Sequence, residues 1–154
     1  LAITLARPAR GHLIPTKLSD YRLGLFASQD YVERNGVPPS GDALGQHPII
    51  GYAPDFIYSD ELRYLAEIKN GLEPSLSSSS INVQHAMIHA SSGIGVLPLF
   101  IGLQDPTLVR ILETSAEITR SFWLVVHKDS RRIARVSAVI DWLKDIVPKH
   151  AGSG

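Results

Sequence analysis

The chain has 154 residues, 44% of them hydrophobic, and its 15 basic residues balance 15 acidic ones to a formal charge of zero. This size and composition predict one or two small packed units rather than a disordered chain, and the zero net charge supplies no overall attraction to nucleic acid or to an anionic membrane. The lack of cysteine excludes disulfides, thiolate nucleophiles and cysteine-bound metals. Because the longest apolar runs fall far short of the roughly 20 residues that span a bilayer, we expect a soluble cytoplasmic protein without a membrane partner.

Strands and turns dominate the first third of the chain. Residues 2–6 form a short apolar run, and residues 13–26 form an extended segment with partial alternation, so both predict strands. Ser28 is a suitable N-cap for a short helix that ends at Gly36. A cluster of turn residues then leads into a single helical turn at residues 42–44 and a strand at residues 47–52.

Helices and strands alternate through the rest of the chain. Ser59 predicts a capped helix with an apolar side that ends near residue 70. Strands are expected at residues 74–78, 94–97, 107–112 and 122–127, with a turn of helix at residues 99–102. Such alternation indicates an α/β sheet that contains parallel pairs of strands.

Two longer helices carry clear apolar spacing. The first runs from Ile81 or Asn82 to Ser92; its expected inward face is Val83, Ala86, Met87 and Ala90, and Gly93 is expected as the left-handed residue that ends it. The second begins near Arg131, and its stripe is Ile133, Val136, Ile140, Leu143 and Val147. We expect Trp123 and Trp142 in the core.

A run of four serines, residues 77–80, carries the main functional hypothesis. It joins the end of a strand to the start of a helix, where hydroxyl groups and unpaired backbone N–H groups gather at one point. Such a point suits a carboxylate or another anion. An ordinary helix cap, in which Ser80 accepts from the first-turn amides, explains the same residues and is the more frequent case when the residues are judged alone.

Motifs for catalysis or metal binding are absent from the sequence. His85 and His89 lie four residues apart on one helix, but no third ligand is evident and the glutamate of a zinc-protease motif is missing. No nucleophile elbow, phosphate-binding loop or acid–base carboxylate pair is present. We therefore expect no enzyme, no metal and no cofactor.

Several short segments, taken in order, resemble the effector-binding domain of LysR-type transcriptional regulators. They are an Arg-Pro turn at residues 7–8, Ala-Ser-Gln-Asp-Tyr at 27–31, Asn-Gly-Val-Pro at 35–38, Gly-Ile-Gly-Val-Leu-Pro at 93–98, Leu-Val-Arg-Ile-Leu at 108–112 and Phe-Trp-Leu-Val-Val-His at 122–127. The resemblance extends over about residues 1–147. Gln29 departs from the family pattern, which usually has a proline there.

The resemblance implies a periplasmic-binding-protein-like two-lobe α/β fold, with lobe two complete and lobe one truncated at its amino end. Residues 1–26 and 121–148 would belong to lobe one, residues 27–120 to lobe two, and residues 149–154 to a flexible tail. The hinges would be Phe26, Ala27 and Ser28 on one crossing, and Ser121, Phe122 and Trp123 on the other. The loop on the cleft wall would bind ligand through Ser78, Ser79, Ser80, Ile81 and Asn82, which makes ligand contact a better explanation than a simple cap.

The same resemblance implies the function of an effector-sensing and oligomerising fragment of a bacterial regulator. Its partners would be a small-molecule effector, expected to be a small anion or carboxylate, and a second copy that packs against the helix of His85 and His89. DNA would be bound only through a winged helix-turn-helix domain absent from this chain. The alternative is a solute-binding module of a transport system, which shares the two-lobe architecture.

Overall fold

Two units, each with its own core, make up residues 1–8 and 12–151, which the computed structural model describes. The first unit combines residues 1–21 with the segment that starts at Thr119, and the second is Arg22–Ile118. Strands β2 (Leu13–Ser28) and β7 (Ile118–His127) contribute residues to both units. The lobe boundaries that we inferred at residues 26–27 and 120–121 are not the same as this division into units, and they remain a prediction.

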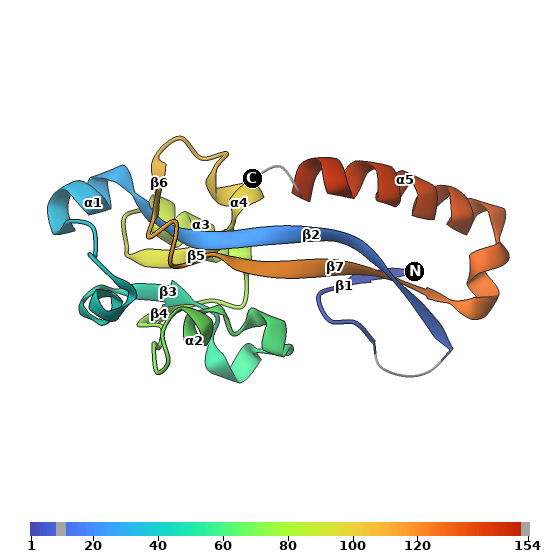
Figure 1. The fold of residues 1–154 in the computed structure, drawn as a ribbon, viewed down its shortest axis with the longest axis horizontal. Helices are drawn as coiled ribbons and strands as arrows, with labels where there is room; N and C mark the ends of the chain where they lie inside the picture. Colours follow the sequence, from blue (N-terminus) through green and yellow to red (C-terminus); the bar gives the residue numbers. More distant parts are fainter. Residues whose placement is uncertain (9–11, 152–154) are drawn as a thin grey trace. The chain divides into compact units, whose positions relative to one another are not determined.

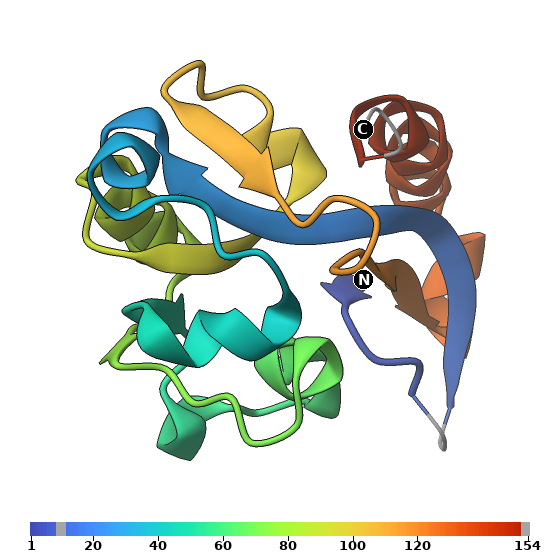
Figure 2. The same ribbon diagram turned by 60° about the vertical axis from the view of Figure 1, so that its left-hand side comes forward.

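A mixed sheet forms the centre of the second unit. Strand β3 (Ile49–Gly51) pairs in parallel with β4 (Leu76–Ser77) and with β5 (Ile94–Pro98), which confirms the expected parallel pairs. The end of β2 pairs antiparallel with β5 and also with β6 (Leu108–Ile111), as Figure 2 shows. Strand β2 has these two antiparallel partners because it lies between β5 and β6 and runs opposite to both.

Local signals in the sequence explain the first helices of this unit. Helix α1 (Gln29–Asn35) begins where the Ser28 hydroxyl accepts a hydrogen bond from the Tyr31 amide at 3.1 Å, and it ends at Gly36 with φ of 77°. A 3₁₀ helix, η1 (Gly41–Gln46), follows the turn cluster. Both predictions are confirmed.

The prediction of a single helix capped by Ser59 is wrong. Its place is taken by three short pieces: η2 (Pro54–Phe56), η3 (Asp60–Leu62) and α2 (Tyr64–Ile68). The Ser59 hydroxyl hydrogen-bonds to the Glu61 carboxylate and does not cap a helix. Arg63, with ψ of 52°, leaves the helical conformation and separates η3 from α2.

Helix α3 (Ile81–His89) buries a different face from the one that we predicted. Gln84 and Ile88 are buried, Ile81 and Met87 pack against the core, and Val83 is 44% exposed. Ala86 and Ala90 are exposed as well. The apolar pattern misled the prediction because the residue at the centre of the buried face is the polar Gln84, whose amide donates to the Ser78 carbonyl at 2.9 Å.

The end of α3 also differs from the prediction. Ser91, with φ of 61°, is the left-handed residue, and Gly93 has φ of 159°. Gly93 is needed for space, since a Cβ there would collide with the Pro48 carbonyl oxygen. Behind this turn lies the core of the unit, formed by Phe26, Ile50, Ile88, Leu97, Leu99 and Leu108. Helix α4 (Leu99–Gly102) closes it, with Gly102 against the Phe26 ring.

The first unit packs helix α5 (Ala134–Ala151) on strands β2 and β7 (Figure 1). Its core is Leu18, Leu124, Val126, Ile140 and Leu143, with Phe122, Val136 and Val147 at the border. Strand β1 (Ala2–Thr4) pairs antiparallel with β7. The stripe that we predicted for this helix is thus confirmed from residue 136 onward.

Three details of this unit depart from the sequence expectations. Ile133 is 41% exposed, because a 3₁₀ turn, η4 (Lys128–Arg132), comes before α5 and the helix begins only at Ala134. Trp142 is 58% exposed and does not lie in the core. Helix α5 continues through Ala151, into the segment expected as a tail, and residues 152–154 lie outside the described part. Among the described residues, no helix combines the length and the apolar character needed to cross a membrane.

We predict that Leu143→Ala destabilises the first unit by about 2–5 kcal/mol, because it leaves a cavity among buried side chains. Urea unfolding followed by circular dichroism measures the change. The matched control is Trp142→Ala, which removes a larger but mostly exposed side chain from the adjacent position. This variant should change the free energy of unfolding by about 0.5 kcal/mol or less. Equal losses for the two variants would contradict the packing described here.

Candidate functional site

The carboxyl ends of the parallel strands in the second unit place the serine run. Strands β3, β4 and β5 point the same way, so the residues that follow Gly51, Ser77 and Pro98 lie at one edge of the sheet. Ligands of open α/β sheets bind outside this edge. The serine loop, residues 77–80, therefore occupies a position suited to ligand binding.

Three hydrogen bonds fix Ser78. Its amide donates to the Gly51 carbonyl at 3.0 Å, its carbonyl accepts from the Gln84 side chain at 2.9 Å, and its hydroxyl accepts from the Ser80 amide at 3.1 Å. Since Gln84 is only 1% exposed, the second bond forms away from water. The loop is held to both β3 and α3, and its backbone is preorganised.

The other predicted ligand residues differ in what they present. Ser79 and Asn82 are exposed and Ser80 is half-buried, while Ile81 packs against the core and offers only its backbone N–H. Ser80 stands at the N-cap of α3, yet its side chain makes no capping hydrogen bond. The ordinary-cap interpretation of Ser80 is therefore wrong. The first turn of α3 contains no acidic residue, so nothing on it opposes the partial positive charge of the helix terminus.

A small cavity of about 150 Å³ lies elsewhere in the second unit, lined chiefly by the segment around η3 and α2. Tyr52 and Tyr64 meet edge to face there with ring centroids 5.9 Å apart, and Arg63 and Glu73 supply the charged groups on its wall. The serine loop does not line this cavity. The structure thus keeps the predicted ligand residues separate from it.

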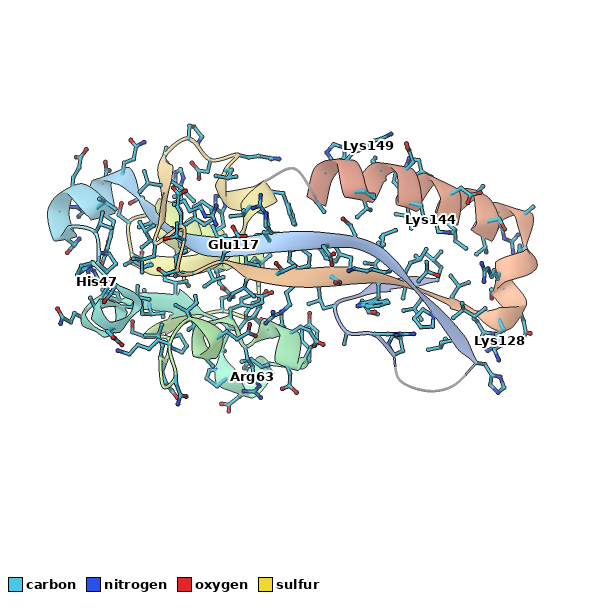
Figure 3. The ribbon with its side chains drawn as sticks, in the orientation of Figure 1. His47, Arg63, Glu117, Lys128, Lys144 and Lys149 are labelled. Atoms are coloured by element: carbon cyan, nitrogen blue, oxygen red, sulfur yellow. The ribbon has the colours of Figure 1, made fainter. Side chains whose placement is uncertain are left out.

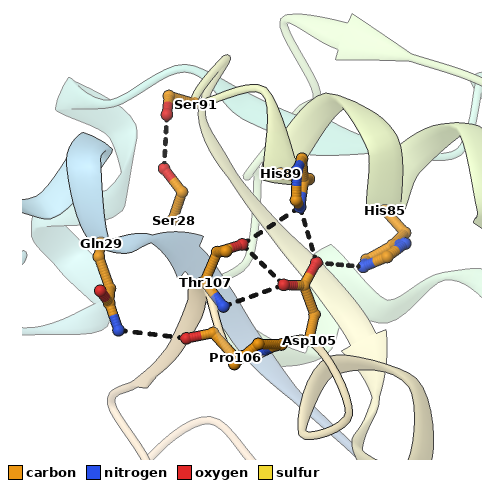
Figure 4. Close-up of polar contacts among 8 residues, drawn as sticks. All are labelled: Ser28, Gln29, His85, His89, Ser91, Asp105, Pro106 and Thr107. Carbon is orange, nitrogen blue, oxygen red and sulfur yellow. Dashed lines mark hydrogen bonds and ion pairs between the residues drawn. The ribbon is translucent and has the colours of Figure 1, made fainter.

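A polar cluster that sequence reasoning missed joins α3 to the loop between α4 and β6 (Figure 4). His85 Nε2 and His89 Nδ1 lie 2.9 Å and 2.8 Å from the same oxygen, Asp105 Oδ2. The other oxygen, Oδ1, accepts from the Thr107 amide at 3.0 Å and from its hydroxyl at 2.6 Å. The four-residue spacing of the histidines signalled a shared helix face, but nothing in the sequence pointed to Asp105 as their partner.

The environment of Asp105 favours its charged form. The Thr107 hydroxyl, then His89, the Thr107 amide and His85 donate to the carboxylate and hold the pKa of Asp105 well below its ordinary value of 3.8, against the opposing effect of burial. The side chain is 10% exposed. Within residues 1–8 and 12–151, no group of three or more histidine or acidic side chains is arranged to hold a metal ion.

A second charged group lies where the chain enters and leaves this unit. Glu117, labelled in Figure 3, pairs with Arg110 at 2.6 Å and with Arg22 at 3.4 Å. The hydrogen bond from Arg110 is the main cause that lowers the pKa of Glu117. Because Arg22 and Glu117 are exposed to solvent, this group holds the two crossing segments together only weakly.

The predicted hinge residues lie in contrasting surroundings. Phe26 and Ala27 are buried in the second unit and Ser28 caps α1. Ser121, Phe122 and Trp123 are half-buried residues of β7, and the Ser121 hydroxyl donates to Asp20 at 2.5 Å. Their role as hinges stays a prediction.

Comparison with known proteins gives a consistent result. The family model of the LysR substrate binding domain matches residues 1–147. The regulatory domain of CrgA, a LysR-type transcriptional regulator from Neisseria meningitidis, is similar with a TM-score of 0.81 and 20% identity, over 93% of this chain and 72% of that one. The structure of CrgA itself is similar with a TM-score of 0.79 and 19% identity, over 93% and 50%.

The regulatory domain of an AphB variant from Vibrio vulnificus is similar with a TM-score of 0.70 and 19% identity, over 92% of this chain and 75% of that one. The comparison with curated proteins gave no match. At these identities the likeness to the solved structures concerns the fold.

We predict that Asp105→Asn lowers the free energy of unfolding by about 1–3 kcal/mol near neutral pH, because it removes a half-buried carboxylate that accepts four hydrogen bonds. Since the pKa of Asp105 is lower in the folded chain than its ordinary 3.8, its contribution is present above that pH and fades as the pH falls below it. The difference in the free energy of unfolding between wild type and variant should shrink over the same pH range. Urea titrations from pH 5 to pH 2.5 measure it; a difference that grows as the pH falls below 3.8 would contradict the cluster.

Proposed function

Because the chain belongs to the LysR substrate binding domain family, we propose that its serine loop contacts the effector. The periplasmic-binding-protein-like two-lobe fold that the sequence predicts agrees with its structural neighbours. Those neighbours are domains of transcriptional regulators, and the alternative of a transport component is not favoured. The ligand residues are Ser78, Ser79, Ser80, Ile81 and Asn82.

The observation that carries the proposal is the unused hydrogen-bonding capacity at a fixed position. Ser80 does not cap α3, while the Ser78 bonds hold the loop backbone in place. A ligand anion at this point accepts from the Ser79 and Ser80 hydroxyls and from the N–H groups of the first turn. A small anion or carboxylate is therefore the effector chemistry that fits best.

The wider regulatory role belongs to the same proposal. Effector binding shifts the chain between two conformations, with Phe26–Ser28 and Ser121–Trp123 as the hinges. A separate winged helix-turn-helix domain binds DNA, in the cytoplasm, and a second copy of the chain completes the regulator. The exposed face of α3, which includes Val83 and Ala86, supplies the surface for that second copy.

The effector contact is tested by titrating the chain with acetate, benzoate and succinate while amide resonances are recorded. We expect the amides of residues 79–82 to shift with at least one of these acids, and Ser80→Leu to weaken that binding about tenfold or more. Ser40→Leu is the matched control, because Ser40 is also an N-cap without a capping side-chain bond and is exposed. Undisturbed amides in all titrations, or unchanged binding by Ser80→Leu, would reject the assignment.

Self-association has its own test. We predict that Val83→Glu raises the dimer dissociation constant of the chain about tenfold or more, because a charge placed in an apolar interface loses its water. Sedimentation equilibrium at micromolar concentration measures this. Val37→Glu is the control, since Val37 is exposed and lies outside α3. A chain that stays monomeric before any substitution would contradict the proposed partner.

A further inference from the structure

We propose that His85, Asp105 and His89 form a proton-responsive clamp, which fastens the C-terminal half of α3 to the loop between α4 and β6. The clamp is independent of whether the serine loop binds effector. Its residues come from two segments that are not neighbours in sequence, and Figure 4 shows both imidazoles directed at one carboxylate oxygen.

The geometry fixes the protonation pattern of the neutral clamp. Asp105 is ionised and can only accept, so each contacting imidazole nitrogen must carry a hydrogen. His85 is then the Nε2–H tautomer and His89 the Nδ1–H tautomer. Together with the two bonds from Thr107, four donors occupy the carboxylate.

Protonation changes the charge of the clamp without changing its connectivity. Imidazole is the side chain that ordinarily gains its proton between pH 8 and 5. Uptake of two protons takes the cluster from one negative charge to one positive charge. Each imidazolium then lies within 2.9 Å of the carboxylate oxygen, whereas the two ring centroids are 6.3 Å apart. Because Coulomb energy falls with distance, the attraction exceeds the repulsion and the clamp tightens.

The described residues that adjoin the clamp are mostly uncharged. Helix α4 consists of Leu99, Phe100, Ile101 and Gly102, and the loop adds the neutral Gln104 and Pro106. Helix α1 reaches the loop through Gln29, whose amide donates to the Pro106 carbonyl at 3.2 Å. Its charged residues Asp30, Glu33 and Arg34 are exposed. On β6, Arg110 is paired with Glu117. The carboxylate of Asp105 stays ionised across this range because its pKa is lowered.

The clamp has a mechanical consequence for α3. The C-terminal end of the helix is also tied to the start of α1 by the hydroxyls of Ser28 and Ser91, 2.7 Å apart. A tighter clamp therefore joins α1, α3 and the loop more firmly at low pH. The chain thus carries a pH-dependent junction at the end of α3 opposite the serine loop.

Two measurements on the chain of residues 1–154 test the clamp. Ring nitrogen resonances at pH 8 should identify His89 as the Nδ1–H tautomer and His85 as Nε2–H. The amide of Thr107, which donates to Asp105, should be about threefold or more better protected from exchange at pH 5.5 than at pH 7.5, after correction for intrinsic rates and relative to the Leu97 amide of β5.

The matched variants separate the clamp from general acid effects. In the double variant His85→Gln and His89→Gln, the pH-dependent change in Thr107 amide protection should vanish, because glutamine does not titrate. In His150→Gln, which alters an exposed histidine of the other unit, the same change should persist. If the double variant fails to fold, His89→Gln alone should reduce the change by half or more. An Nε2–H tautomer at His89, a protection that is constant or lower at pH 5.5, or a response retained without the histidines would each overturn the proposal.

Discussion

The hydrogen bond between the buried Gln84 amide and the Ser78 carbonyl is the contact on which the organisation of the second unit depends. A primary amide that is 1% exposed must find partners inside the protein, because an unpaired polar group there costs several times the net gain of a hydrogen bond. Its partner, Ser78, directly follows the short strand β4, which is paired with β3 over only two residues. The bond therefore sets the position of α3 relative to the sheet edge, and with it the position of the serine loop.

Helix α3 is consequently held by polar contacts at both ends and by apolar contacts between them. Gln84 fixes its amino-terminal half, Ile88 fills the core behind it, and the two histidines bind Asp105 at its carboxyl-terminal half. Polar contacts of this kind are directional, so they define one position where apolar packing alone tolerates several. A regulator requires such definition, because a signal can pass through an element only if its alternative positions are discrete.

The sequence predicts the strands, the cap at Ser28 and one helix face well, because local chemistry determines them. Ser28 at the start of α1, and the stripe of Val136, Ile140, Leu143 and Val147, follow from capping and helical period alone. The prediction failed where tertiary contacts decide. The buried face of α3 is centred on a glutamine, which no hydrophobic pattern identifies, and the helix expected after Ser59 breaks at Arg63. The candidate site was predictable only in part. The serine run is evident in the sequence, whereas the contact of Asp105 with His85 and His89 depends on the packing of the loop before β6 against α3.

The likeness to the structural neighbours, at about 20% identity, concerns the fold alone. The backbone of this chain meets close steric limits at two positions: Gly93 has no room for a Cβ beside Pro48, and Gly102 lies against the Phe26 ring. Such constraints specify the path of the backbone and say nothing about the ligand. The polar chemistry of the second unit comes from its side chains. Gln84 orders the serine loop from inside, and Asp105 gathers two histidines at the far end of the same helix, so both polar functions converge on α3.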